Sequence, residues 1–220
     1  WRLVSQPLLG IVISVALERL GLFCLHGGSV DVNGKAVIVL GDKGAGKSTT
    51  VSSLQRAGHR LLTDDLVAMD CGDLTRAPQV QTGFPVVKLW PDSAKALAVD
   101  TETGTELIHP SITKIQKQID PTQMARPTPA GAIFLLSPRQ TGETRAERVP
   151  ETSALEALLY FAFIARFGNT SLGPAHLGQF MKRCCYVVKT TPVYTLHIRR
   201  DLDRLSDLVA EIDRQVMELS

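Results

Sequence analysis

Residues 41–48 read Gly-Asp-Lys-Gly-Ala-Gly-Lys-Ser and match the pattern G-x-x-x-x-G-K-[ST] at every position. The preceding run, Lys35–Leu40, is apolar after its first residue, which is typical of a strand buried on both faces of a sheet. Residues 49–57 favour a helix, and Gly58 would end it. A buried strand, a glycine-rich turn and a helix in this order predict an α/β fold with the turn at the edge of a sheet.

The chemistry of this turn predicts a site for the phosphates of a nucleoside triphosphate. Its glycines let the backbone wrap closely and aim N–H groups inward, at the positive end of the following helix. Lys47 adds a charge for the β- and γ-phosphates, and the Ser48 hydroxyl is a ligand for Mg²⁺. The residues expected to bind the nucleotide are Gly41, Asp42, Lys43, Gly44, Ala45, Gly46, Lys47, Ser48 and Thr49. A glycine-rich turn without a ligand is the alternative, but a chance match in such a chain arises on the order of 1 time in 100.

Two adjacent carboxylates, Asp64-Asp65, follow the loop by about one helix and one strand. A carboxylate that holds Mg²⁺ in a phosphate-loop protein usually lies at the end of a neighbouring strand. Because adjacent carboxylates repel each other, we expect one to bind metal while the other accepts a proton from a hydroxyl. A solvated pair at a strand end, or a helix cap, is the alternative for this pair taken alone.

His26 precedes the loop in the sequence Leu25-His26-Gly27-Gly28, which we expect to form a turn between short strands at residues 22–25 and 29–32. The glycines there would let a substrate approach the imidazole closely. A surface or core histidine is the alternative. The Asn33-Gly34 pair that follows predicts a hairpin turn, because both of its residues accept a positive φ.

The chain has no internal repeat or clear linker, which predicts a single domain over residues 1–220. Its core is expected at residues 22–70. Residues 75–130 contain seven prolines and are expected to be an irregular segment on the substrate side. Further strands are expected at residues 86–89, 132–136 and 193–198, helices at 8–20, 92–98, 153–165 and 202–219, a basic segment at 114–117 and an exposed loop at 139–148.

Composition excludes several other classes of protein. A net charge of +2 and an aromatic content of 5% argue against a nucleic-acid binder, which would usually carry a basic stripe or stacking platforms. The apolar run at residues 8–17 is too short to span a bilayer and lacks the flanks of a signal peptide. Four cysteines without a C-x-x-C pair favour reduced thiols. We therefore expect a cytoplasmic protein with no membrane or nucleic-acid partner.

Four of these elements, in order and spacing, resemble the catalytic domain of HPr kinase/phosphorylase and its shorter relatives. They are Leu25-His26-Gly27, Asp31–Gly34, Gly41–Ser48 and Gly58–Asp65, and the resemblance covers about residues 22–70. It implies a phosphate loop in a mixed β-sheet, an architecture shared with bacterial phosphoenolpyruvate carboxykinases. It also implies MgATP as the phosphate donor and a serine hydroxyl as the acceptor. Carried over by position, His26 and Asp64 form an acid/base pair, while Ser48 and Asp65 serve the metal.

Within this family, the chain looks like the small HPr-kinase-like proteins, including those encoded with lasso peptide pathways. The resemblance therefore implies a kinase that tailors a peptide, such as a ribosomally made precursor, or a protein. The family also often forms higher oligomers, so a homo-oligomer is a further expectation. We find no counterpart of the family's later signature that supports dephosphorylation, which leaves phosphorylase activity open.

Two other classes of protein compete with the kinase interpretation. One is a phosphate-loop ATPase or GTPase that couples hydrolysis to a conformational change. A GTPase would need an N-K-x-D sequence and an ABC-type ATPase an L-S-G-G-Q-like signature, and the sequence has neither. The other class is a nucleotide-sensing module without turnover. His26 and Asp64-Asp65 favour a kinase, because a switch protein has no need of a proton acceptor beside the phosphate.

Overall fold

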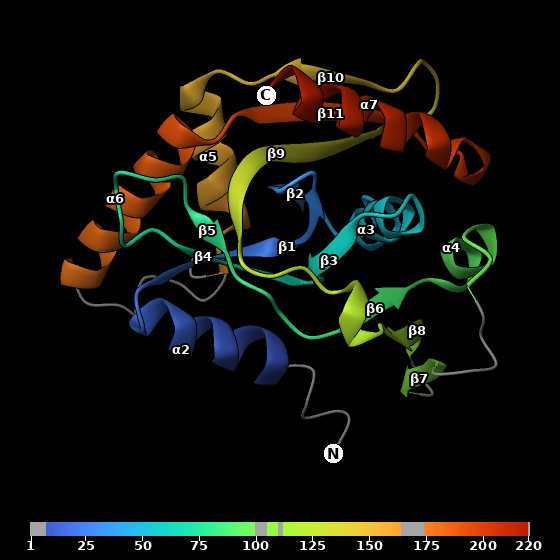
Figure 1. Cartoon of the computed structure of the whole chain (residues 1–220), viewed down its shortest axis with the longest axis horizontal. Helices are drawn as coiled ribbons and strands as arrows, with labels where there is room; N and C mark the ends of the chain where they lie inside the picture. Colours follow the sequence, from blue (N-terminus) through green and yellow to red (C-terminus); the bar gives the residue numbers. More distant parts are fainter. Residues whose placement is uncertain (1–7, 100–104, 110–111, 164–173, 220) are drawn as a thin grey trace.

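The computed structural model describes residues 8–99, 105–109, 112–163 and 174–219 of the chain (Figure 1). Strands in this part form a mixed sheet of eight strands and a smaller sheet of three. The larger sheet has the order β10 (Arg145–Arg148), β11 (Val193–Arg199), β9 (Thr128–Arg139), β2 (Lys35–Leu40), β1 (Leu22–Val32), β4 (Leu66–Asp70) and β5 (Gln79–Val80), with β3 (Arg60–Thr63) beside β1. β2, β9 and β11 are mutually parallel, and the other pairings are antiparallel.

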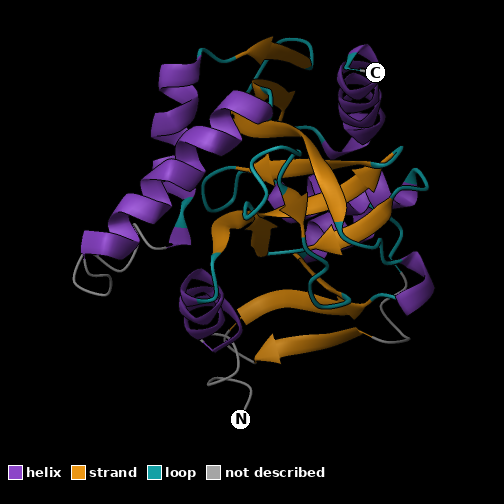
Figure 2. Ribbon diagram, turned by 60° about the vertical axis from the view of Figure 1, so that its left-hand side comes forward, coloured by secondary structure: helices purple, strands orange, loops and turns teal. Residues whose placement is uncertain are grey.

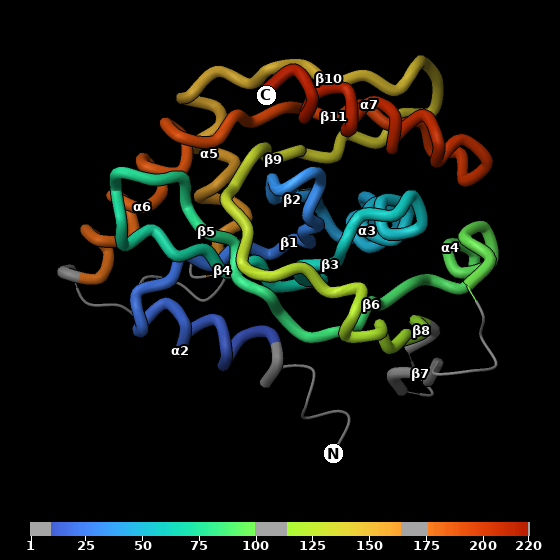
Figure 3. The backbone as a smooth tube through the Cα atoms, in the orientation of Figure 1, coloured from blue at the N-terminus to red at the C-terminus, as the bar shows by residue number. Residues whose placement is uncertain are grey.

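Long strands let this sheet curl back on itself. β1 pairs with β4 through its first half and with β2 through its second half. β9 pairs with β5 at its start and with β2 and β11 further along, and its yellow trace curves accordingly in Figure 3. The pairings β9–β2–β1–β4–β5–β9 therefore close a ring. β2 is held between β1 and β9 in this ring, and the phosphate loop leaves from its end.

Helices cover both faces of the larger sheet (Figure 2). α5 (Glu151–Phe161) and α6 (Pro174–Thr190) pack on one face, and α3 (Lys47–Arg56) and α7 (Leu205–Glu218) pack on the other. α2 (Ile13–Arg19), which continues a π-helical turn η1 (Leu8–Val12), lies against β1 and β4. The fold predicted from the sequence, an α/β architecture with a phosphate loop in a mixed sheet, is confirmed.

The alternation of side chains along β2 shows why this strand must be apolar throughout. Ala36, Ile38 and Leu40 lie in the core beneath α5 and α6, whereas Val37 and Val39 lie in the core beneath α3 and α7. All five are fully buried. Successive side chains of a strand point to opposite faces, so a strand covered on both sides has no position for a polar residue.

The smaller sheet lies beside the N-terminal end of α3 and contributes to the site. It has the order β6 (Val86–Leu89), β8 (Ile112–Gln118), β7 (Thr105–His109). α4 (Pro91–Ala96) follows β6 and contacts both β8 and the turn η5 (Leu202–Arg204) that precedes α7. A second short turn, η2 (Pro121–Gln123), leads from β8 to β9. The predicted irregular segment 75–130 therefore contains more regular structure than its prolines suggested.

The hairpin prediction is confirmed, but the turn predicted at His26-Gly27-Gly28 is wrong. Asn33 and Gly34 have φ of 53° and 80° and join Val32 to Lys35. Residues 26–28, in contrast, continue β1 without interruption. A Cβ atom on Gly27 would lie 2.6 Å from the Val39 carbonyl oxygen. The glycine is thus required because β2 approaches closely, and not because the chain turns there.

Other differences concern boundaries. α3 begins at Lys47 and not at residue 49, because Gly46 takes a left-handed conformation (φ 103°) that lets the helix start directly after it. The predicted loop at residues 139–148 contains the end of β9 and all of β10. The predicted helices at 92–98 and 153–165 correspond to α4 and α5, and α6 was not predicted. Residues 164–165 of the predicted helix lie outside the described part of the chain.

Two further features concern the chemistry and length of the elements. Cys24, Cys71 and Cys184 are buried free thiols, and Cys185 is an exposed one. Through the described residues, every helix falls short of the length or the apolar content that crossing a bilayer demands.

Candidate phosphate-transfer site

The phosphate loop joins the end of β2 to the start of α3. Gly44 and Gly46 have φ of 84° and 103°, a conformation that side chains other than glycine rarely adopt. The Thr50 N–H donates to the Gly46 carbonyl at 2.8 Å, so the helical bonds begin at the last loop glycine. The Ala45 N–H donates to the Asp42 carbonyl at 3.0 Å. The N–H groups of the first helical turn have no acceptor within the helix, and such groups attract anions at its positive end.

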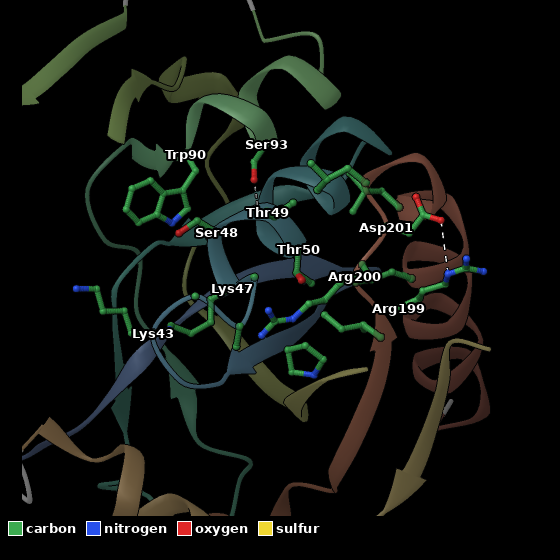
Figure 4. A pocket seen from close by; sticks show the side chains of 18 of the residues that line it. Lys43, Lys47, Ser48, Thr49, Thr50, Trp90, Ser93, Arg199, Arg200 and Asp201 are labelled. Carbon is green, nitrogen blue, oxygen red and sulfur yellow. Dashed lines mark hydrogen bonds and ion pairs between the residues drawn. The ribbon is translucent and has the colours of Figure 1, made fainter. Parts of the chain in front are cut away.

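Lys47 folds back over the loop. Its ammonium donates to the Gly41 carbonyl at 2.7 Å and to the Asp42 carbonyl at 3.2 Å. Figure 4 shows Lys43, Lys47, Ser48, Thr49 and Thr50 around one cavity. The structure thus brings together the residues from Lys43 onward that the motif predicted.

Asp64 lies between the loop and the smaller sheet. One of its oxygens accepts a hydrogen bond from the Ser48 hydroxyl at 3.1 Å, and the other accepts one from the Lys88 backbone N–H at 3.0 Å. Burial and the neighbouring Asp65 carboxylate raise the pKa of Asp64 to about 7. At neutral pH this carboxyl can therefore exchange a proton readily.

Asp65, the next residue, has the opposite character. Burial acts to raise its pKa, but nearby positive charges together outweigh burial and lower the pKa, chiefly the Lys88 ammonium, 2.7 Å from its carboxylate. Lys114 and His26 act in the same direction. Asp65 also has a positive φ of 76°, which turns the chain sharply between β3 and β4. The two adjacent aspartates therefore differ: at neutral pH the Asp64 carboxyl is close to its pKa, whereas the Asp65 carboxylate is ionised.

His26 reaches this pair from β1. Its Nδ1 lies 3.1 Å from the Asp65 carbonyl oxygen, which favours a proton on that nitrogen. The Phe163 ring meets the imidazole edge to face, with centroids 5.6 Å apart. The structure therefore places His26 at the β3–β4 turn, although it reaches that turn from within a strand and not from the predicted turn.

A cavity of about 510 Å³ is lined by the loop from Lys43 onward, by His26 and by Asp65, and its volume is in the range that holds small-molecule ligands. Asp64 is not one of the lining residues, but it contacts Ser48, which is. Sequence reasoning missed much of the cavity lining. Besides the loop, His26 and Asp65, the cavity is lined by Lys88, Trp90, Ser93, Lys114, Pro138, Thr144 and a run near the end of the chain that includes Ile198–Leu202, Arg204, Leu205 and Leu208. The Thr49 and Ser93 hydroxyls are hydrogen-bonded at 2.9 Å, which ties α4 to the start of α3.

The signal that could have found the last of these segments lies in the sheet. The ends of parallel strands meet at one edge, and ligands of open α/β sheets bind there. β2, β9 and β11 are parallel, so the loop after β2 lies beside Pro138 near the end of β9 and Ile198 near the end of β11. Recognising this would have required the strand order, which no local motif reveals.

The metal site must be judged from its donors. Over residues 8–99, 105–109, 112–163 and 174–219, no three His, Cys, Asp or Glu residues are grouped as a metal site of protein ligands. Magnesium usually keeps several waters and binds through one or two carboxylates plus phosphate oxygens. The Ser48 hydroxyl and the two aspartates fit that mode of binding. Ser48 contacts Asp64 here, so Asp64 is a candidate ligand beside the predicted Asp65.

Comparison with known proteins finds similarity to HPr kinase/phosphorylases over part of the chain. No protein-family model matches the chain. The HPr kinase/phosphorylase of Limosilactobacillus reuteri is 37% identical over 114 residues, which is 50% of this chain and 34% of that protein. That of Clostridium beijerinckii is 41% identical over 69 residues, 29% of this chain and 22% of that protein. A solved HPr(Ser) kinase/phosphatase from Coxiella burnetii aligns with 89% of this chain at a TM-score of 0.40 and 13% identity, covering 98% of that chain.

The alignments span about a third or less of the length of these curated relatives. Sequence identity within them is nevertheless consistent, and more of the matched proteins carry the same name, among them that of Treponema pallidum, 49% identical over 47 residues, 21% of this chain and 15% of that protein. By this sequence similarity, part of the chain resembles the HPr kinase/phosphorylases.

Proposed function

We propose that this chain is an ATP-dependent kinase, which transfers the γ-phosphate of MgATP to a hydroxyl, with a serine of a peptide or protein as the acceptor. The observation that carries the proposal is the position of Asp64 against Ser48, together with its pKa of about 7. A general base is most effective when its pKa lies near the working pH. The name of the relatives, HPr kinase/phosphorylase, agrees with this chemistry.

Each residue has a role in the proposed transfer. Main-chain N–H groups of the loop and the Lys47 ammonium bind the phosphates and neutralise charge on the transferring group. Ser48 and Asp65 would hold the magnesium ion, which supplies further charge neutralisation when bound. Asp65 suits that role, because Lys88 keeps it ionised.

The bond changes follow from these positions. Asp64 takes the proton from the acceptor hydroxyl as the hydroxyl oxygen bonds to the γ-phosphorus. The bond between this phosphorus and the oxygen that bridges to the β-phosphate breaks, and ADP leaves. His26 lies at the same turn through its contact with the Asp65 carbonyl, where it can tune or relay the proton.

Two acceptors deserve testing on present grounds. The relatives are named for HPr, and the small HPr-kinase-like proteins suggest a ribosomally made precursor peptide, as in lasso peptide pathways. Phosphorylase activity, in which inorganic phosphate removes the serine phosphate, is a further outcome to measure. Four free thiols agree with the cytoplasm as the proposed setting.

The test follows labelled γ-phosphate from ATP to HPr and to synthetic serine peptides, with serine-to-alanine peptides as controls and free phosphate measured in parallel. We expect transfer by the parent chain and its loss in Asp64→Asn, while Asp70→Asn, an exposed aspartate at the end of β4, remains active. ATP hydrolysis without transfer to any acceptor would favour an ATPase instead. ATP binding without either reaction would favour a sensing module.

The same variant separates the two roles open to Asp64. If Asp64 is the base, Asp64→Asn binds MgATP normally and needs no more magnesium than the parent. A raised magnesium requirement would instead assign Asp64 to the metal, next to Ser48.

A further inference from the structure

The cavity extends beyond the groups that the proposed transfer uses. His26 and Asp65 reach it from β1 and the β3–β4 turn, on one side of β2 in the sheet. Pro138 and Ile198 reach it from β9 and β11, on the other side of β2. The loop lies between them, because it leaves the end of β2 itself.

This second side carries several apolar side chains beside three arginines. Ile198, Leu202, Leu205 and Leu208 all line the cavity. A Cβ atom on Gly46 would lie 3.8 Å from Ile198 Cδ1, so this side chain borders the loop directly. Leu202 remains 39% exposed, so part of its side chain is open to a ligand. η5, which carries Leu202, also contacts α4.

Two adjacent arginines differ in their surroundings. Arg199 is held 3.6 Å from the Asp201 carboxylate. Figure 4 shows Arg199 directed toward Asp201, whereas the Arg200 side chain extends toward the phosphate loop and Lys47. In the part of the chain that the structure describes, the Arg200 guanidinium has no hydrogen-bond or ion-pair partner. A guanidinium binds phosphate oxygens well, because its N–H groups form a planar fork.

We propose that the segment Ile198–Leu208 is the nucleoside half of the nucleotide site. Its apolar side chains contact the base and ribose, and Arg200 contacts the phosphate chain. The direction follows from the sheet: the γ-phosphate faces His26 and Asp65, so the phosphate chain leads away from them and the nucleoside lies toward β9 and β11. This inference rests on the proposed triphosphate site, and it assigns selectivity for a nucleotide over bare polyphosphate to the C-terminal segment.

The experiment compares the affinities of MgATP and magnesium tripolyphosphate, which lacks the nucleoside, by titration calorimetry. We expect the parent chain to bind ATP about tenfold more tightly or better, since only ATP buries apolar surface against the leucines. Leu202→Gln keeps the size of the side chain and adds no charge. It should weaken ATP binding about threefold to tenfold and leave tripolyphosphate unchanged. Leu177→Gln, with a leucine of similar exposure (41%) on α6, is the matched control and should change neither.

Substitution of Arg200, followed by the same titrations, gives a second readout. Arg200→Ala should weaken the binding of both MgATP and magnesium tripolyphosphate by about tenfold, because both carry the phosphates that a guanidinium binds. Arg76→Ala, which removes an exposed ion pair with Asp73 outside the cavity, should leave both affinities within about twofold. Equal effects of the two arginine substitutions would contradict the role of Arg200.

Three results separate this inference from the proposed function. Equal affinity of the parent chain for ATP and tripolyphosphate overturns the nucleoside subsite and leaves the phosphate loop standing, as does a Leu202→Gln variant that binds ATP normally. Failure to bind either ligand overturns both proposals. Selective ATP binding without transfer to any acceptor overturns the kinase alone.

Discussion

The two ends of the cavity are built in different ways. The loop at the phosphate end is one continuous segment that runs into the first turn of α3, and it presents main-chain N–H groups and two glycines with positive φ, Gly44 and Gly46. The opposite end is assembled from side chains of α4, β9, β11, η5 and α7. Main-chain groups bind phosphate whatever the neighbouring side chains are, whereas side-chain walls change with every substitution. The comparison teaches that the proposed phosphate site is local, while the rest of the cavity depends on how distant segments meet.

Lys47→Ala disrupts the phosphate end of the cavity without changing the opposite end, and it has the largest expected effect. Removing the ammonium leaves the charge of the β- and γ-phosphates without its mobile partner, and we expect transfer to fall about 100-fold or more. Lys189→Ala, at the end of α6, serves as the control and should retain activity. Activity of Lys47→Ala within a fewfold of the parent would contradict the role of the loop.

Lys88→Ala tests a group that joins the loop region to the smaller sheet. Loss of its ammonium should raise the pKa of both aspartates, since Lys88 lowers each of them. Below the midpoint of the pH–rate profile, each unit that the pKa of Asp64 rises lowers its ionised fraction about tenfold. We expect a midpoint at higher pH for Lys88→Ala and a smaller change for Lys88→Arg. An unchanged midpoint would mean that Lys88 does not act through the carboxylates.

Gly27→Ala tests the strand that replaced the predicted turn. Its new methyl group would meet the Val39 carbonyl and the Leu40 side chain, and we expect the free energy of unfolding in urea to fall by about 1–3 kcal/mol. Gly178→Ala, in α6, would meet nothing within 4 Å and should be neutral or slightly stabilising. Equal stabilities of the two variants would contradict the close approach of β1 and β2.

The smallest effect is expected on the outer side of the loop. The Tyr160 hydroxyl, on α5, donates to the Asp42 carboxylate at 3.0 Å in an exposed position. Tyr160→Phe removes this bond, and we expect at most about 1 kcal/mol of stability to be lost in the same urea titration. ATP affinity should stay unchanged, because Tyr160 does not line the cavity. A large loss of ATP affinity would mean that Tyr160 also contributes to binding the phosphates.

The sequence predicted those parts of the molecule that local rules determine. Asn33-Gly34 takes the turn that its φ preferences require, and β2 is buried on both faces as its apolar run indicated. The turn predicted at residues 26–28 was wrong, because a glycine indicates either a turn or the close approach of a neighbouring strand. Only the position of β2 distinguishes these two cases. Asp64 and Asp65 were found as a pair, but their different protonation states depend on Lys88, which comes from another sheet.

The distant part of the site lay beyond sequence reasoning. Arg200 and Leu202 carry no motif, and they line the same cavity as the loop only because β11 lies beside β9 and β9 beside β2. α6 was missed as well, although residues 174–190 form the longest helix in the described part of the chain. Both cases depend on pairings between residues far apart in the sequence, which a single sequence does not display.

If Asp64 is the proposed base, its ionisation affects activity and stability with opposite signs. Its pKa is raised from 3.8 to about 7 in the folded chain, so the folded state binds this proton more tightly than the unfolded state. Its contribution to stability is therefore greatest below pH 3.8 and is lost as the pH rises to about 7. The proton-accepting form, in contrast, grows over the same range. Asp64→Asn should remove this part of the pH dependence of unfolding.

The central claim, that Asp64 accepts the proton of the acceptor hydroxyl, is tested most directly by the pH dependence of single-turnover phosphate transfer. The parent chain should show a rate that rises with pH and levels off above a midpoint of about 7. Asp64→Asn should be at least about 100-fold slower, without that midpoint, while its affinity for MgATP stays the same. A variant that transfers phosphate at the parent's rate, with the parent's midpoint, would contradict the account.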